Sequence, residues 1–508
     1  MSDRVPLSLE IFDLVSRRVD ATSLPEEDKI LIKAVMRDYL TIGQTFMEKH
    51  RAVTHLLKMI FGPFTEKMAK ALPPLQRPKA GKKKPRGHGR KGASAYTGGR
   101  TVSVPNALKA GDTCPGCEKG KVYPTLAGLT VRITGNAPLD ATSFECEKLR
   151  CNLCGEIFSP DLPKDAGDKK YDETAGAMIA LMKYGTGVPF NRLEQLQEGF
   201  GIPLPASTQW DIIEKTADRI YPAYDELMRQ AAQGRLIHND DTTMKILAPA
   251  NDERKGTFTT GMLSVTDEQK IALFFTGHKH AGENLADLLG KRHVGLDPPI
   301  QMCDGLLRNQ PKDFATLLAN CMVHARRNFF DESVNFPDEC EHVIEVLAGV
   351  YKNEAATKEK KMTGRQRLAY HQSESGPLMD ELHQWIDTQF DEKKVEPNSG
   401  LGRAFSYMLK RWDPLTLFLR VEGAPIDNNE VERALKMAIL HRKNALFFKT
   451  MHGAYIGDLF MSLIHTCRLS KINPFDYLVV LQKHSAEVFK NPQKWLPWNY
   501  IEAAALLP

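Results

Sequence analysis

The sequence predicts a multidomain α+β protein, and three observations support this fold class. The chain has 508 residues, more than one hydrophobic core usually holds, so several domains are expected. Two C-x-x-C pairs, "CPGC" and "CNLC", stand before residue 160, and residues 231–335 are rich in β-type runs. This segment predicts three strands, a helix, a fourth strand and a long helix, the element order of a ribonuclease-H-like α/β core. We expect that core with a helical insertion, N-terminal helices, a zinc-ribbon-like domain and a helical C-terminal segment.

These patterns divide the chain into eight expected regions. In chain order they are an N-terminal helical region (1–75), a basic flexible linker (76–105), a zinc-binding domain (106–165), a helical region with a possible DNA-binding helix-turn-helix (166–230), the first part of the core (231–335), the helical insertion (336–415), the return helix of the core (416–450) and a C-terminal helical segment (451–508).

Composition and charge are those of an ordinary folded chain. Hydrophobic residues make up 42% and charged residues 26%, and the net charge is +5. No apolar run approaches the roughly 20 residues of a membrane helix, and the N-terminus lacks the apolar core of a signal peptide. We therefore expect a cytoplasmic protein whose nine cysteines are thiols or metal ligands rather than disulfides.

The linker contains a strongly basic segment. Residues 77–100 include nine Lys or Arg, no Asp or Glu, and many Gly, so the segment cannot bury enough surface to fold alone. It is either a solvated linker or a basic arm that contacts phosphates, and the two interpretations are compatible. The candidate DNA-contacting residues of this arm are Lys82, Lys83, Lys84, Arg86, Arg90 and Lys91.

The two C-x-x-C pairs have the spacing of a structural zinc site. Cys114 and Cys117 precede Cys151 and Cys154 by 33 intervening residues. Each pair can bind a tetrahedral ion from a tight turn, and two pairs complete a four-thiolate Zn²⁺ site without an open position. Such a site is structural rather than catalytic. The alternatives are coincidental free thiols and competition from Cys146.

Residues 166–230 predict two helices separated by a turn. The first ends near 199–201, and Ser207 or Thr208 could cap the second. The pair is either a DNA-binding helix-turn-helix or two packed helices without a DNA role, and spacing alone favours packed helices.

The first expected strand carries two adjacent carboxylates, Asp240 and Asp241, in "RLIHNDDTTMKILA". Alternate residues of a strand share a face, so the two point in opposite directions. Asp240 shares its face with Leu236 and Met244, whereas Asp241 lies on the more polar face. This favours Asp240 as the site residue and Asp241 as the more solvated one.

Two further carboxylates are candidates for the same site. Asp304 ends the expected fourth strand, which would run beside the first and bring this carboxylate near Asp240. The alternative is that Asp304 is an ordinary turn residue.

Residues 311–333 predict one long helix, and residues 427–447 predict another. In the latter, Asp427 and Glu430 could form a capping box, while Glu432 adjoins the buried face one turn before Lys436. A surface Glu–Lys pair is the alternative for Glu432.

Three carboxylates from distant segments repel one another unless cations lie between them. Two Mg²⁺ or Mn²⁺ ions suit hard oxygen ligands, and a pair of such ions can cleave a phosphodiester. The sequence therefore predicts a two-metal site at Asp240, Asp304 and Glu432.

The motifs together resemble transposases of the insertion sequence 66 family, in the DDE superfamily, over nearly the whole chain. The resemblance is carried by "CPGC…CNLC", "HNDDTT", "IQMCDG", "CMVHARRNFFD", "SGLGRAFSYMLKRWDPL", "IDNNEVERALK" and "SLIHTCRLSKINPFDYL". It implies that Asp240, Asp304 and Glu432 are the catalytic, metal-binding triad. This chain has Asp241 and Thr243 where the family usually has Glu and Pro, and Leu306 where it has Tyr; neither departure removes a carboxylate.

The resemblance also implies supporting and DNA-contacting residues. Cys321 and His324 would support the site, with a core thiol and a satisfied core His as the preferred alternative. Trp412 would stack on a distorted base, with a core Trp as the alternative. Phosphate contacts would come from Arg326, Arg327, Arg433, Lys436, Arg442 and Lys443, each of which is otherwise an ordinary surface charge.

The implied function is transposition of DNA. The partners would be double-stranded DNA of element ends and target, at least a second copy of the chain in the synaptic complex, and possible companion proteins from the same element. The implied location is the bacterial cytoplasm, at the nucleoid when DNA is bound. A structure-selective nuclease on the same core and an inactive DNA-binding repressor are the rival functions.

Overall fold

The computed structural model describes residues 9–38, 106–124, 136–150, 152, 154, 157–163, 166–248, 254–266 and 268–506. The basic arm and Cys151 lie outside these residues. The chain divides into two compact units. The larger contains 168–194 and 204–508, and the smaller contains 74–167 and 195–203. Across the described residues, no helix combines the length and the apolar character needed to cross a membrane.

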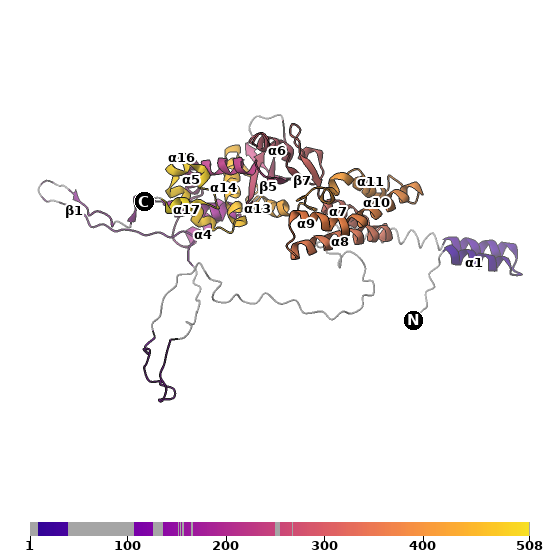
Figure 1. Ribbon diagram of the computed structural model, residues 1–508, viewed down its shortest axis with the longest axis horizontal. Helices are drawn as coiled ribbons and strands as arrows, with labels where there is room; N and C mark the ends of the chain where they lie inside the picture. The colour runs from indigo at the N-terminus through magenta and orange to yellow at the C-terminus, as the bar shows by residue number, and fades with distance from the viewer. Residues whose placement is uncertain are drawn as a thin grey trace. The chain divides into compact units, whose positions relative to one another are not determined.

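A five-stranded mixed sheet forms the centre of the larger unit (Figure 1). Its spatial order is β6-β5-β3-β7-β8. The antiparallel part comprises β3 (Leu236–Thr243), β5 (Phe258–Val265) and β6 (Lys270–Gly277). The part parallel to β3 comprises β7 (Ile300–Cys303) and β8 (Leu317–Asn320). Strand β3, the first strand of this sheet along the chain, thus occupies its middle.

Strand β8 corrects the prediction of one long helix over residues 311–333. Residues 317–320 pair with β7 in parallel register, and helix α7 begins only at Met322 (Met322–Glu332). A short apolar run such as "LLAN" fits a strand or a helix, and here pairing with a buried neighbour selects the strand.

Helices cover both faces of the sheet around β3. Helix α13 (Asn429–Ala445) lies over the face that carries His238, since His238 Nδ1 lies 3.0 Å from Asn428 Oδ1 and Val431 packs on Leu263 and Ala272. Helix α6 (Ala281–Leu289) lies over the opposite face, where Asn284 Nδ2 donates to Thr260 Oγ1 at 2.8 Å. The central strand is therefore enclosed, as its buried residues require.

Helix α14 (Met451–Leu469) closes the outer edge of β6. The side chains of Asp458, Ser462 and Thr466, one turn apart, accept from the backbone N–H groups of Thr276, Phe274 and Ala272 at 2.6, 3.0 and 3.1 Å. An edge strand leaves these N–H groups unpaired, and α14 satisfies them without a further strand. This role explains three polar residues on a largely buried helix.

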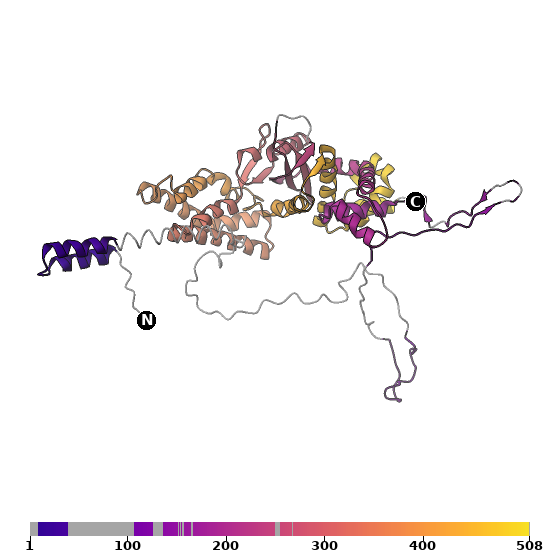
Figure 2. The ribbon, with the colours of Figure 1, turned by 180° about the vertical axis from the view of Figure 1, so that it is seen from behind.

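The helical insertion follows α7 and shares one apolar core with β7, β8 and α7, in which Phe329 of α7 packs with Phe405 and Phe418 of the insertion. Figures 1 and 2 both show the sheet between the insertion (orange) and the C-terminal helices (yellow). Its helices are α8 (Pro337–Glu359), α9 (Gly364–Glu374), α10 (Gly376–Asp391), α11 (Gly400–Leu409), α12 (Trp412–Leu415) and the 3₁₀ turn η6 (Leu417–Leu419).

The remaining helices of the larger unit include α5 (Ala206–Ala231), and several of the others pack against it. The others are α3 (Glu173–Ala180), the π-helical turn η4 (Leu181–Gly185), α4 (Phe190–Gly199, whose end belongs to the smaller unit), α15 (Pro474–Lys483), α16 (Ser485–Lys490), η7 (Pro492–Lys494) and α17 (Tyr500–Ala505). A short parallel pair joins β4 (Ile246–Ala248) to β9 (Phe448–Thr450), and α1 (Leu9–Asp20) lies near the N-terminus.

Helix α5 corrects one detail of the expected helix-turn-helix. It begins at Ala206 with Pro205 as N-cap, so neither Ser207 nor Thr208 caps it. Ile213, Ile220 and Leu227 are fully buried. The helix contacts α3, α14 and α16. Much of α5 is therefore committed to packing.

Candidate active site

Asp240 and Asp304 occupy equivalent positions on neighbouring parallel strands, Asp240 within β3 and Asp304 directly after β7. His238 on β3 pairs with Met302 on β7, and each Asp stands two residues further along its chain. Asp304 is held there, because its Oδ1 accepts from Leu306 N at 3.0 Å and from Asn309 Nδ2 at 2.6 Å. The strand pairing thus brings together two of the predicted site residues.

Helix α13 brings Glu432 to the same face of the sheet. Gly261 pairs with Asp240 across β5 and β3, and a Cβ at Gly261 would lie 2.8 Å from the side chain of Leu435. Glu432 stands three residues before Leu435, on the same side of the helix. Because glycine has no side chain, position 261 lets α13 approach the sheet beside Asp240.

The electrostatics of Asp240 reflect these neighbours. Burial, followed by the charges of Asp304, Asp241 and Glu432, raises the pKa of its carboxyl to about 7, although one backbone hydrogen bond from Asp241 N at 2.8 Å lowers it. A carboxyl with such a pKa is half-protonated at neutral pH unless a cation compensates its charge. Carboxylate oxygens are the ligands that Mg²⁺ and Mn²⁺ prefer, so this donor set fits them.

Asp241 lies on the opposite face of β3, as alternation predicts, but the expectation that it is the more solvated residue is wrong. Its side chain is only 3% exposed. Oδ2 lies 2.9 Å from His280 Nδ1, and Oδ1 pairs with Arg308 at 3.4 Å. The start of α6 and the turn η5 (Leu307–Asn309) cover this face, which the local sequence of β3 could not reveal.

Asn428, directly before α13, is a site residue that the sequence analysis missed. It is fully buried. Its Nδ2 donates to Asn239 O at 3.2 Å, and its backbone N–H donates to Cys321 Sγ at 3.2 Å. Together with the contact to His238, these bonds tie the start of α13 to β3 and to the start of α7. The only signal was its place in "IDNNEVERALK".

Tyr407 and Arg411 of the insertion are two further missed residues. Tyr407 OH donates to the backbone oxygen of Asp304 at 3.1 Å, and the Arg411 guanidinium lies over the Tyr407 ring at 4.1 Å. Gly305 has φ +82°, and a Cβ there would lie 2.9 Å from Arg411 Nε, so glycine is required. The insertion thereby fixes the turn that carries Asp304.

Cys321 and His324 lie beside Glu432. One potential ligand atom from each of the three residues lies within 4.8 Å of the others, and this is the single such cluster found across the described residues. Cys321 is fully buried, which raises the pKa of its thiol to about 12. His324 Nδ1 is buried without a hydrogen-bond partner, so the preferred interpretation as a satisfied core His is wrong for that atom.

Three of the residues that were predicted to contact DNA make contacts within the protein. Arg442 donates from Nη1 to Thr242 Oγ1 at 3.0 Å and to Thr243 Oγ1 at 2.7 Å, so its guanidinium is anchored on the end of β3. Arg326 lies over the Tyr351 ring at 5.5 Å. Trp412 packs edge-on to His383 at 4.5 Å within the insertion.

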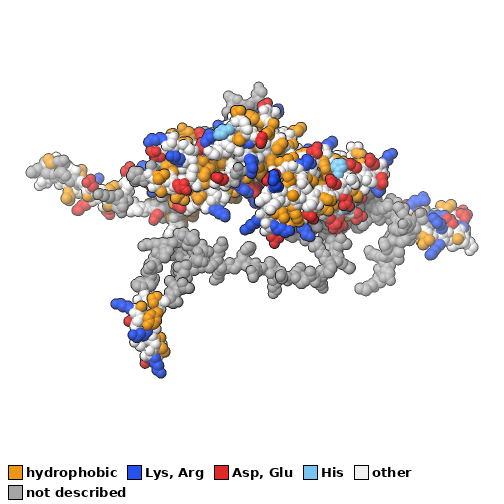
Figure 3. Space-filling view, viewed as in Figure 1, with side chains coloured by type: hydrophobic (Ala, Val, Ile, Leu, Met, Phe, Trp, Pro, Cys, Tyr) orange, Lys and Arg blue, Asp and Glu red, His pale blue; other side chains and the backbone are white. Residues whose placement is uncertain are grey.

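Other basic residues are open to solvent. Figure 3 shows Lys and Arg side chains scattered among Asp and Glu over one face. The exposed members of the predicted DNA-contacting set are Arg327, Arg433, Lys436 and Lys443.

The predicted capping box of α13 is wrong. Asn428 is the N-cap, and Glu430 pairs with Lys270 at 2.7 Å instead of closing back on the helix start. Asp427 accepts from Asn429 N at 3.1 Å, which is a local turn contact. Tertiary pairing with β6 thus outcompetes the local cap.

The described cysteines of the two pairs in the smaller unit are Cys114, Cys117 and Cys154. Thr113 bridges Lys121, Cys114 N donates to Gly120 O at 2.8 Å, and Gly120 N donates to Cys117 Sγ at 3.4 Å. Backbone N–H groups of this turn lower the pKa of the Cys117 thiol. Cys154 lies between β1 (Leu149–Arg150) and β2 (Ile157–Phe158), which pair antiparallel. Since Cys151 is not described, the four-thiolate site stays a prediction.

Comparison with known proteins gives one family match and three relatives. The sequence model described as "Transposase IS66 family" matches residues 170–456, more than half of the chain. The relatives are all named as uncharacterized proteins of Sinorhizobium fredii. Protein y4hP is 27% identical over 71% of this chain and 68% of its own length. Protein y4jD is 26% identical over 64% and 65%, and y4qI is 24% identical over 64% and 62%. The chain thus spans about two thirds of the length of these relatives.

Proposed function

Because the chain belongs to the IS66 family of transposases, we propose that it is a DDE-type DNA transposase with Asp240, Asp304 and Glu432 as its catalytic carboxylates. It binds the terminal inverted repeats of its element, cuts DNA to free 3′-hydroxyls and joins them to target DNA. The observation that carries this proposal is that the three carboxylates lie close enough for the charges of Asp304 and Glu432 to raise the pKa of Asp240. The strand order, with β3 central and β7 and β8 parallel to it, supports a ribonuclease-H-like core.

The carboxylates are proposed to hold two Mg²⁺ or Mn²⁺ ions. When bound, these ions supply an activated water or 3′-hydroxyl and stabilise the leaving oxygen of the phosphodiester. Asn309 and the Tyr407 hydroxyl hold Asp304 in place, while Asn428 fixes the start of the helix that carries Glu432. These contacts preorganise the oxygen ligands before DNA binds.

Phosphate contacts are proposed for exposed cations near the carboxylates. Arg433, Lys436 and Lys443 lie on the exposed side of α13, and Arg327 lies on α7. The basic arm before residue 105 would add further contacts. Because neutralised phosphates release counterions, affinity for DNA should fall steeply with salt concentration.

The partners follow from the reaction. Joining two element ends requires at least a second copy of the chain in the synaptic complex, and companion proteins from the same element are proposed partners. The smaller unit would bind one structural Zn²⁺ through Cys114, Cys117, Cys151 and Cys154. The proposed location is the bacterial cytoplasm, at the nucleoid when DNA is bound.

The deciding experiment incubates the full chain with pre-cut element ends, a target plasmid and Mg²⁺. Joined products are expected from the wild type, and neither cut nor joined products from Asp304→Asn. Asp313→Asn, an exposed acid in the connection from β7 to β8, is the matched control and should retain activity. Cleavage without joining would indicate a nuclease, and binding without either product would indicate a repressor. Full activity of Asp304→Asn would overturn the site.

A further inference from the structure

A thiol, an imidazole and a carboxylate gather at one point between α7, β8 and α13. Cys321 is the N-cap of α7, and its backbone N–H donates to Cys303 O at 2.9 Å. His324 follows on the first turn of α7, and Glu432 faces both from the first turn of α13. Their potential ligand atoms lie within 4.8 Å of one another.

The cluster has the chemistry of a borderline-soft metal site. Zn²⁺ is typically bound by Cys sulfur, His nitrogen and carboxylate oxygen at about 2.0–2.3 Å, with three protein ligands leaving one open position. The three ligand atoms would have to draw closer than their present separation, within 4.8 Å of one another, to form such bonds. Mg²⁺ has little affinity for thiolate or imidazole, so this donor set differs in kind from the three carboxylates.

The imidazole of this cluster lacks a partner that a purely structural histidine would need. His324 Nδ1 is buried and accepts or donates no hydrogen bond among the described residues. Cys321 Sγ accepts a backbone N–H from Asn428 at 3.2 Å, and the backbone N–H groups of Val323 and His324 also act on the thiol, as at the start of a helix. A buried polar group without a partner lowers stability, and a cation bound to this nitrogen would offset that loss.

We propose that Cys321, His324 and Glu432 bind one Zn²⁺ ion, at a site separate from the four cysteines of the smaller unit. The ion links the start of α7 to the first turn of α13. It would thereby hold the carboxylate of Glu432, whose charge also acts on Asp240. This binding needs neither DNA nor catalysis, so it stands or fails independently of the proposed transposition.

Zinc content of the metal-stripped full chain after reconstitution with Zn²⁺ and gel filtration tests the proposal. Cys321→Ser and His324→Ala should each bind one equivalent less per chain than the wild type. Cys340→Ser, which alters a fully buried thiol of α8 outside the cluster, is the matched control and should bind as much as the wild type. Equal zinc content in wild type, Cys321→Ser and His324→Ala would overturn the site.

A second measurement covers the case in which those variants fail to fold. In the full chain carrying Cys114→Ser, Cys117→Ser, Cys151→Ser and Cys154→Ser, neither cysteine pair of the smaller unit can bind metal. Co²⁺ added to this variant should produce the thiolate-to-metal absorption band of a site with a single sulfur ligand, and X-ray absorption of the Zn²⁺ form should show one sulfur with nitrogen and oxygen neighbours. Zinc bound without sulfur, or no bound metal, would overturn the proposal.

Discussion

Gly261 and Leu435 lie so close together that a Cβ at position 261 would be 2.8 Å from the Leu435 side chain. Gly261 is also the β5 partner of Asp240. The packing of α13 on the sheet, and so the placement of Glu432 relative to Asp240, depends on this absent side chain.

Gly261→Ala should therefore destabilise the protein by about 1–3 kcal/mol, because the added methyl overpacks the contact with Leu435. Leu435→Ala removes the obstructing atoms, so the double variant should lose less stability than the sum of the two single variants. Urea unfolding of the wild type and the three variants measures this coupling. Strict additivity would contradict the packing argument.

Asp240→Asn should stabilise the metal-free protein at alkaline pH while abolishing DNA cleavage. The folded-state pKa of Asp240, about 7, exceeds its unfolded value, so its contribution to stability is complete below about pH 4 and is lost as the pH rises through 7. The Asn variant lacks this loss and should gain about 1–3 kcal/mol at pH 8, with little difference at pH 4.

Thermal unfolding in a chelator at several pH values checks this expectation, and Mg²⁺ provides its control. Mg²⁺ should raise the Tm of the wild type at pH 8, because it compensates the clustered carboxylates, and should raise that of Asp240→Asn much less. Equal stabilisation of both proteins would place the metal elsewhere.

Asn428→Ala should cost about 1–3 kcal/mol of stability, because it leaves His238 Nδ1 and Asn239 O buried without their present partner. It should also lower cleavage more than that loss of stability explains, since the start of α13 is no longer tied to β3. Asn429→Ala, at the partly buried next position, is the matched control. Cleavage rates under conditions where both variants are fully folded compare them.

Tyr407→Phe removes one hydrogen bond to the backbone of Asp304 and keeps the ring under Arg411. The expected loss of stability is about 0.5–1.5 kcal/mol. A larger effect is expected on kcat than on DNA binding, because the tyrosine positions a carboxylate rather than the substrate. A change in DNA affinity with unchanged kcat would argue against that role.

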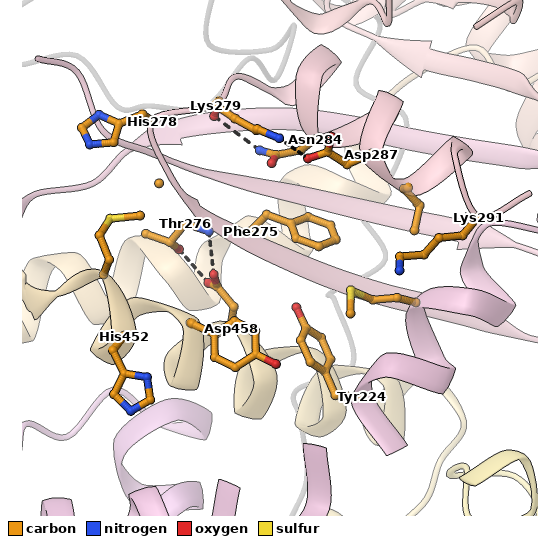
Figure 4. Close-up of a pocket in the computed structure, with 15 residues that line it drawn as sticks. Tyr224, Phe275, Thr276, His278, Lys279, Asn284, Asp287, Lys291, His452 and Asp458 are labelled. Carbon is orange, nitrogen blue, oxygen red and sulfur yellow. Dashed lines mark hydrogen bonds and ion pairs between the residues drawn. The ribbon is translucent and has the colours of Figure 1, made fainter. Parts of the chain in front are cut away.

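Asp458→Asn should flatten the pH dependence of stability without affecting cleavage. Burial raises the pKa of Asp458 to about 7, against its hydrogen bonds from Thr276 N and Oγ1, both 2.6 Å (Figure 4). As a group with a raised folded-state pKa, it contributes stability below about pH 4 that is lost as the pH rises through 7. An Asn amide can replace the protonated acid, so the variant should be the more stable protein at pH 8. A steeper decline than in the wild type, followed by urea unfolding, would refute this.

Local patterns predicted the elements that carry the candidate site. Alternation along "HNDDTT" placed Asp240 and Asp241 on opposite faces, and helical periodicity placed Glu432 beside the buried face of α13. The family resemblance is confirmed by the match over residues 170–456. By contrast, β8 was mistaken for helix, and the capping box at Glu430 was wrong, because strand pairing and the ion pair with Lys270 come from segments distant in sequence.

By itself, the sequence determined most of the strands and helices, and it placed the candidate carboxylates on β3, just after β7 and in the first turn of α13. Secondary structure depends largely on residues that are close in sequence, so hydrophobic periodicity and motif spacing can reveal it. Only the tertiary structure decided that Asp241 is enclosed by His280 and Arg308, that Asn428 joins three elements, and that Cys321, His324 and Glu432 meet. Such contacts join residues up to nearly two hundred positions apart, and they exist only once the packing of helices on the sheet has fixed every distance.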